Sequence, residues 1–236
     1  MMLNVKEVAR LLNVSDKKVY RLIAQNDVPV YKIGEEYRFN RVELLEWATL
    51  MGIRVSSDTF EEGNLNSSPA TCFLDALKAG SIIYSIGGND KSSVLRSLVN
   101  VLNLPEDIDP EFLYQVLLAR EKLGSTGIGE GIAIPHVRNP VILNVKKPVV
   151  TLCFLENPID FDAIDGLPVN VLFTLISPTI HAHLHLLSRL GFVLQNPGFK
   201  AVIRRQAPPE VILEALARAE ACIPTTNNIQ NNVEIK

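Results

Sequence analysis

The residues best suited to chemistry in this sequence are its four histidines, one after a glycine-rich segment and three close together. His136 ends the segment LAREKLGSTGIGEGIAIPH, and the others lie between positions 181 and 185. A neutral imidazole presents one nitrogen as a nucleophile while a hydrogen bond holds the other. This suits phosphoryl transfer, in which cationic or hydrogen-bonding groups stabilise the oxygens of the transferring group. Candidates for that supporting role are Arg120, Arg138, His181, His183 and His185.

Two other interpretations of these histidines stay open from the residues alone. A histidine after a strand is often a structural residue with satisfied hydrogen bonds. Alternatively, His181 and His185 share one face of a helix and could bind zinc with His136 as a third ligand, although no glutamate lies between them in HExxH style. The glycines do not predict a dinucleotide site, because their GxGxG spacing leads into a strand rather than opening a helix. No nucleotide cofactor is therefore expected at these glycines.

A helix, a glycine-rich turn and a short strand must position His136. The helical period ends at Leu123, Gly124 stops the helix, and the strand 132–134 leads directly to Pro135 and His136. Ligands collect at strand ends in open α/β sheets, so His136 is expected to meet a molecule that arrives from solvent. The other expected elements are buried strands at 148–154 and 169–175 and helices at 91–102, after Asp109, at 183–194 and at 209–221. This order predicts a three-layer α/β domain with a mixed sheet.

The first 55 residues have the pattern of a small winged helix-turn-helix module. Asn4 and Ser15 are good N-cap residues for two short helices separated by a tight corner, and the second helix is basic on its free face. Alternating residues at 30–39 predict a hairpin that turns at 34–36, and Asn40 precedes a third helix. A helix-turn-helix places its second helix in the major groove of DNA.

This order of elements, with the segments YKIGEEYRF and RVELLEWA, resembles excisionase-like, MerR-related winged helix-turn-helix domains over residues 2–50. The wing tip departs from that family, because Glu35 and Glu36 would repel phosphates. An alternative is that the basic residues form only a solvated face on a module that binds protein. The resemblance implies a DNA-contacting set of Lys17, Lys18, Tyr20 and Arg21 on the second helix and Lys32 and Arg38 on the hairpin.

The phrase REKLGSTGIGEGIAIPH, followed later by HLHLLSRLG, resembles the type 2 enzyme IIA domain of the bacterial phosphotransferase system, in its fructose, mannitol and nitrogen-related branches. The resemblance covers residues 71–223. It implies that His136 accepts a phosphoryl group from the phosphohistidine of HPr or a related phosphocarrier, with His183 and Arg120 completing the site and no metal or nucleotide. The residue after the histidine is commonly small in this family, so Val137 could obstruct the donor.

Composition places the chain among ordinary globular proteins. With 236 residues, 47% hydrophobic and 21% charged, it is not collagen-like, wholly disordered or a disulfide scaffold. Its longest apolar runs fall short of the roughly 20 residues that a membrane span needs. Three cysteines without a close pair favour a reducing compartment, hence a cytoplasmic protein.

The expected division is a winged helix-turn-helix domain at 1–54, a linker at 55–70, the IIA domain at 71–223 and a disordered tail at 224–236. The expected function is a cytoplasmic phosphotransferase-system regulator, phosphorylated on His136 and bound to DNA through its front domain. The alternatives are a phosphoryl carrier that passes its phosphate to a IIB component in sugar uptake, or a binding protein that is never phosphorylated. Winged domains often act in pairs on symmetric sites, so an oligomer is compatible with this interpretation.

Overall fold

A computed structural model describes residues 2–25, 28–50, 53, 72–105, 108–137, 143 and 145–222. The expected linker at 55–70 and tail at 224–236 lie outside the described residues, as does Arg138. None of the helices in the described ranges has both the length and the apolar run that crossing a bilayer requires.

The N-terminal domain is the predicted helix-turn-helix with a hairpin. Asn4 accepts a hydrogen bond from the Glu7 amide and Ser15 from the Lys18 amide, so each of the first two helices begins at a capped residue. A short first strand, which the sequence did not indicate, pairs antiparallel with the second strand of the hairpin. The elements are β1 (Met2–Leu3), α1 (Val5–Leu11), α2 (Asp16–Ala24), β2 (Tyr31–Ile33), β3 (Glu36–Asn40) and α3 (Arg41–Leu50).

The α/β domain is built on a five-stranded mixed sheet in the order β4-β7-β8-β6-β5. The pairs β4–β7 and β6–β8 are parallel, whereas β7–β8 and β5–β6 are antiparallel. Its strands are β4 (Ser81–Ile86), β5 (Gly127–Gly129), β6 (Ile132–Ala133), β7 (Val149–Ile159) and β8 (Val169–Ile176). Its helices are α4 (Phe73–Ala79), α5 (Lys91–Val101), α6 (Pro110–Leu123), α7 (Ile180–Val193), α8 (Pro197–Arg204) and α9 (Pro209–Ala221).

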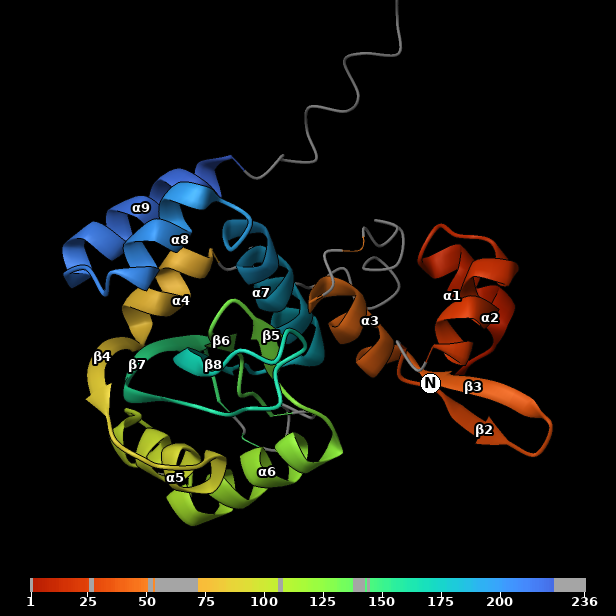
Figure 1. The fold of residues 1–236 in the computed structure, drawn as a ribbon. Coiled ribbons are helices and arrows are strands. Elements are labelled where there is room, and N and C mark those ends of the chain that lie inside the picture. The colour runs from red at the N-terminus through yellow and green to blue at the C-terminus, as the bar shows by residue number, and fades with distance from the viewer. Residues whose placement is uncertain are drawn as a thin grey trace, which may run out of the picture.

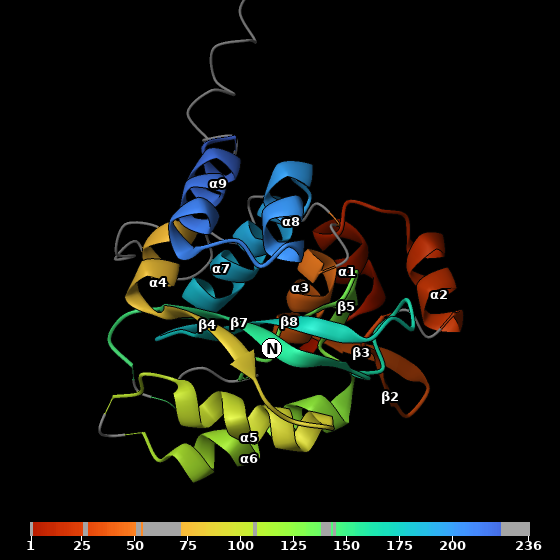
Figure 2. The ribbon, with the colours of Figure 1, turned by 60° about the vertical axis from the view of Figure 1, so that its left-hand side comes forward.

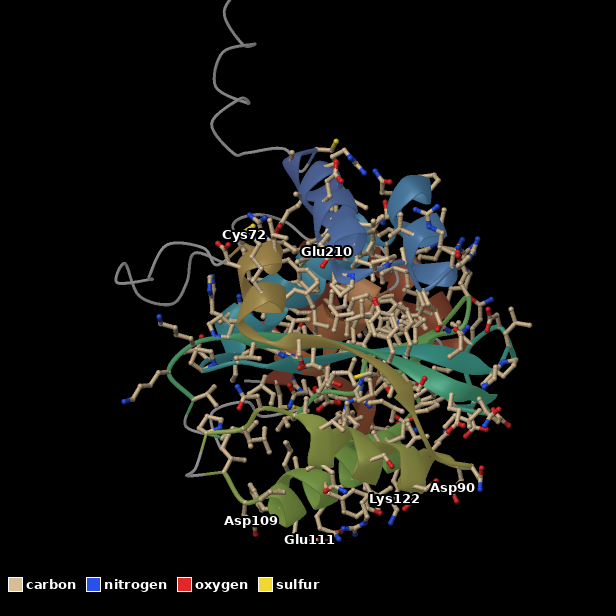
Figure 3. All side chains as sticks on the ribbon, turned by 90° about the vertical axis from the view of Figure 1, so that its left-hand side faces the viewer. Cys72, Asp90, Asp109, Glu111, Lys122 and Glu210 are labelled. Carbon is tan, nitrogen blue, oxygen red and sulfur yellow. The ribbon has the colours of Figure 1, made fainter. Side chains whose placement is uncertain are left out.

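Helices cover both faces of this sheet, as Figure 2 shows: α4, α7, α8 and α9 on one side and α5 and α6 on the other. Successive strand residues face opposite sides, so Leu152 and Phe154 enter the core beneath α7 while Cys153 enters the core beneath α5 and α6. Figure 3 shows Asp109, Glu111 and Lys122 on the outer side of α6, away from the sheet. The predicted three-layer α/β fold with a mixed sheet is confirmed.

The α/β domain also differs from the sequence-based expectation in several details. Helix α7 begins at Ile180 rather than at 183, because the Thr179 hydroxyl accepts a hydrogen bond from the Ala182 amide and starts the helix there. Helix α8, capped by Asn196 with Pro197 in its first turn, was not expected. Strand β5 was not expected either, since its glycines have low strand propensity.

One contact between the N-terminal domain and the α/β domain is made by helix α3. Helix α3 packs against α7, and Figure 1 shows the two helices side by side. The helix that closes the winged domain therefore also contacts the helix that carries His183.

Candidate functional site

Two imidazoles, those of His136 and His183, lie next to one another between the sheet and α7. Their ring centroids are 5.0 Å apart and their planes are inclined by 37°. His136 follows β6 and forms a bridge with Leu175 of β8, while the amide of His183 donates to the Thr179 carbonyl in the first turn of α7. The exposed fractions are 0% for His136 and 1% for His183. A strand end and a helix start thus bring two distant segments together.

The backbone fixes which nitrogen of His136 can act as a nucleophile. Nδ1 lies 2.6 Å from the Ile134 carbonyl oxygen. A carbonyl only accepts hydrogen bonds, so Nδ1 carries the proton and Nε2 carries the lone pair of the neutral ring. This hydrogen bond favours the tautomer of His136 that is protonated on Nδ1, in which Nε2 is the nitrogen able to attack.

Val137 does not obstruct this imidazole, contrary to the expectation from sequence. Val137 is buried in the core beneath α5 and α6, whereas Ile134 belongs to the core beneath α7. Neighbouring residues of an extended segment point to opposite sides, so His136 shares the α7 side with Ile134 and Val137 faces away. The expectation that His136 is open to solvent is also wrong for this arrangement, since the ring is completely buried.

Arg120 lies at the end of α6, where its Nη1 donates to the Gly124 carbonyl over 2.9 Å. The structure brings the two histidines together and places Arg120 in the wall of a cavity of about 650 Å³. Both domains contribute to this cavity, which is lined by Pro29, Val30, Tyr31, Glu43 and Trp47 from the N-terminal domain and by Arg120, Leu123, Gly124, Ser125, Gly127, Ile128, Asp162 and Ile164 from the α/β domain.

The glycine-rich turn before His136 is held by two carboxylates that the sequence analysis did not single out as structural supports. Buried Glu121 accepts hydrogen bonds from the amide and the hydroxyl of Thr126. Asp165 accepts from the amides of Glu130 and Leu167. Gly129 adopts φ +95°, a region that favours glycine. The only sequence signal for Glu121 was its position in the last turn of a helix.

The remaining histidines of α7 do not join this pair in a metal site. His181 is exposed, and His185 lies 3.4 Å from Nε of Arg189. Burial, followed by the charge of Arg189, lowers the pKa of His185. Within the described ranges, no three histidine, cysteine, aspartate or glutamate side chains form a group that could hold a metal ion. The zinc interpretation, which required His136, His181 and His185 to converge, has no support in this geometry.

The residues expected to contact DNA share one module. Lys17, Lys18, Tyr20 and Arg21 are exposed on α2, while Val19 and Ile23 of the same helix are buried. The Tyr20 ring lies 6.2 Å from that of Tyr37, edge to face, and so connects α2 with the hairpin.

On the hairpin, Lys32 is exposed and Arg38 is half-buried. Nη2 of Arg38 pairs with Oε2 of Glu36. The acidic wing tip therefore engages one of the cations expected to contact the DNA backbone.

The fold and the paired imidazoles define a two-domain protein in which a helix-turn-helix module precedes an α/β domain with a histidine site. Residues 75–219 match the family model of the phosphoenolpyruvate-dependent sugar phosphotransferase system EIIA 2, and residues 2–49 match a helix-turn-helix domain model. The chain belongs to the EIIA 2 family, as its motifs predicted.

Its relatives include nitrogen regulatory proteins and a phosphotransferase-system component. A nitrogen regulatory protein of Pseudomonas aeruginosa is 36% identical over 142 residues, which cover 58% of this chain and 90% of that protein. The fructose-specific EIIABC component of Bacillus subtilis is 27% identical over 145 residues, which cover 60% of this chain but only 22% of that protein. The crystal structure of nitrogen regulatory protein IIA-Ntr from Neisseria meningitidis matches with a TM-score of 0.55 and 28% identity over 62% of this chain and 99% of that structure.

Proposed function

We propose that this protein is a cytoplasmic regulator of the bacterial phosphotransferase system whose His136 is phosphorylated by HPr or a related phosphocarrier, and whose N-terminal domain binds DNA. The observation that carries the proposal is the buried pair of His136 and His183 within a domain of the EIIA 2 family. The nitrogen regulatory relatives and the helix-turn-helix match favour regulation.

In the proposed step, Nε2 of His136 attacks the phosphorus of the donor phosphohistidine. The new phosphorus–Nε2 bond forms as the phosphorus–nitrogen bond of the donor breaks, and the donor, whose other ring nitrogen carries a proton, leaves as a neutral imidazole. Positive charge then develops on the His136 ring, where the Ile134 carbonyl stabilises it through the Nδ1 proton. We assign to His183 and Arg120 the role of stabilising the negative charge on the phosphoryl oxygens. One imidazole replaces another, so the step is readily reversible.

Labelling tests this assignment. Incubation with enzyme I, HPr and ³²P-labelled phosphoenolpyruvate should give an acid-labile label on the wild type and none on His136→Ala. His183→Ala should transfer about 100-fold more slowly, the usual loss when one group that stabilises a developing charge is removed. His181→Ala, on the exposed face of the same helix, is the control and should label normally. A label retained by His136→Ala would refute the proposal.

The DNA-binding half has its own test. Lys18→Ala and Arg21→Ala should each weaken a gel shift, and each lost phosphate contact should reduce the slope of log affinity against log salt by about 1. Lys6→Ala removes an exposed cation from α1, outside the expected interface, and should leave binding unchanged. If the chain binds no DNA in a selection from random sequences, the module is a protein-binding one.

The likeness to the fructose-specific EIIABC component favours a second candidate, a phosphoryl carrier in sugar uptake. Such a carrier would hand its phosphate to a IIB domain. Adding purified fructose IIB to the labelled protein distinguishes the two: rapid transfer of the label supports the carrier, and a stable label supports the regulator.

A further inference from the structure

The contacts of the N-terminal domain fall on the elements that carry the proposed phosphorylation site. Helix α3 packs against α7, which holds His183 (Figure 1). Tyr31, Glu43 and Trp47 form one side of the 650 Å³ cavity, and Arg120 at the end of α6 lies on the other. The N-terminal domain therefore extends across both elements that supply the partners assigned to His136.

Two buried leucines, one on α3 and one on α7, lie outside the cores of the two domains. On α3, Leu44 and Ala48 belong to the core of the N-terminal domain, whereas Leu45 is 4% exposed and belongs to no core cluster. On α7, Leu184 is 5% exposed and likewise lies outside every cluster. Among the described residues, these are the two buried apolar side chains that belong to none of the hydrophobic core clusters. They lie on α3 and α7, the two helices that pack together. Both leucines therefore fit apolar packing at the α3–α7 contact.

The proposed nucleophile is inaccessible in this arrangement, in which α3 packs against the helix that carries His183. A donor phosphohistidine must bring its phosphorus within bonding distance of Nε2, in line with its own leaving nitrogen. With His136 and His183 buried, no protein donor can reach that position in this arrangement. Beside the docked domain, Leu123 and Ile164 line the cavity with exposed fractions of 68% and 67%, an apolar rim of the kind that protein partners cover.

We infer that the N-terminal domain and the phosphoryl donor compete for one face of the α/β domain. The occupant in the closed form is the chain's own segment 29–48, with α3 seated on α7, and the donor gains access only after this segment separates. The α2 residues expected to contact DNA remain exposed in the closed form, so DNA binding does not require opening. This inference rests on the proposed phosphorylation of His136 and specifies its regulation.

The full-length Leu45→Asp variant tests the competition without relying on phosphorylation. An unpartnered carboxylate in the α3–α7 interface should shift the chain toward the open form and raise the rate of His136 modification by diethyl pyrocarbonate, followed by mass spectrometry, at least about tenfold. Phosphorylation by HPr should accelerate in parallel. Ile33→Asp makes a similar change at an exposed position of the same domain and should alter neither rate.

A reversible chemical cross-link between α3 and α7 distinguishes opening of the domains from misfolding of the Leu45→Asp variant. Leu45→Cys and Leu184→Cys, combined with Cys72→Ser and Cys222→Ser, allow the two helices to be joined by a short bismaleimide that a reductant cleaves. The tethered chain should resist modification and phosphorylation, and cleavage should restore both.

Equal modification of His136 in the wild type, Leu45→Asp and the tethered chain would overturn the competition, whatever the labelling shows. Faster modification of Leu45→Asp with no phosphate on any variant would overturn the proposed phosphorylation and leave the competition standing.

Discussion

At the scale of single residues, the wing tip should weaken the proposed binding of the N-terminal domain to DNA. Glu36 both neutralises Arg38 and adds a negative charge where phosphates would lie. Glu36→Gln should therefore release Arg38 and tighten DNA binding about threefold to tenfold at 0.1 M salt, with a steeper salt dependence. Titration of a fluorescent duplex by anisotropy measures this change.

The matched control for that variant is Glu111→Gln. It breaks a similar exposed pair, with Arg96, on the α/β domain and changes the net charge equally. If both variants bind DNA with the same affinity as the wild type, Arg38 has no part in the interface.

At the scale of elements, the start of α4 depends on a side chain from α9. Cys72 at the N-cap makes no side-chain cap, and Glu220 instead accepts hydrogen bonds from the amides of Phe73 and Leu74 at 2.6 and 3.0 Å. Arg189 of α7 donates to the same carboxylate at 2.6 Å. Because buried hydrogen bonds to a charge are strong, Glu220→Gln should lower the free energy of unfolding by about 2 kcal/mol in urea denaturation at pH 7.

This loss should depend on pH. Burial opposes ionisation of Glu220, but the hydrogen bonds from Cys72, Leu74, Phe73 and Arg189 outweigh burial and hold its pKa below the ordinary value. A depressed pKa stabilises the fold above the unfolded-state pKa, and this stabilisation disappears as the pH falls through the folded-state pKa. The difference between wild type and variant should therefore shrink in acid.

Glu214→Gln, which removes an exposed i,i+4 pair from the same helix, is the control and should cost less than about 0.5 kcal/mol at either pH. A difference between wild type and Glu220→Gln that stays constant with pH would mean that the carboxylate charge does not matter.

Local signals in the sequence predicted most of these helices and strands. Contacts between segments that are far apart in the chain could not be predicted from those signals. Caps at Asn4 and Ser15 and the apolar period of α9 are properties of a few neighbouring residues, and these helices agree with the prediction. The cap that Glu220 provides requires knowing which helix ends meet. The same holds for β1, whose two residues become a strand only through their pairing with β3.

The candidate site likewise has features that local sequence predicted and features that it could not predict. The residues alone left His136 with three interpretations, and the family motif, rather than spacing, selected His183 as its neighbour. The burial of His136 was not predictable, because it depends on contacts with segments far along the chain, such as Leu175 and His183.

At the scale of the whole molecule, phosphorylation and domain docking should oppose each other. A phosphoryl group adds about −1.5 to −2 charges, and burying such a charge among apolar groups is costly. His136 is completely buried in the docked arrangement, and by the inferred competition it is reached only after the domains separate, so the phosphorylated chain should favour the open form. By thermodynamic linkage, variants that open the chain should also retain phosphate more strongly.

Small-angle X-ray scattering tests this expectation on the intact protein. Phosphorylation of the wild type should increase its radius of gyration and maximum dimension, because separated domains joined by a chain segment span more space than docked ones. His136→Ala treated with the same donor mixture should keep the compact profile. Leu45→Asp should be extended before treatment and change little afterwards. If the phosphorylated wild type remains as compact as the untreated protein, the charge is accommodated inside the closed form, and domain separation is a step in phosphoryl transfer rather than its result.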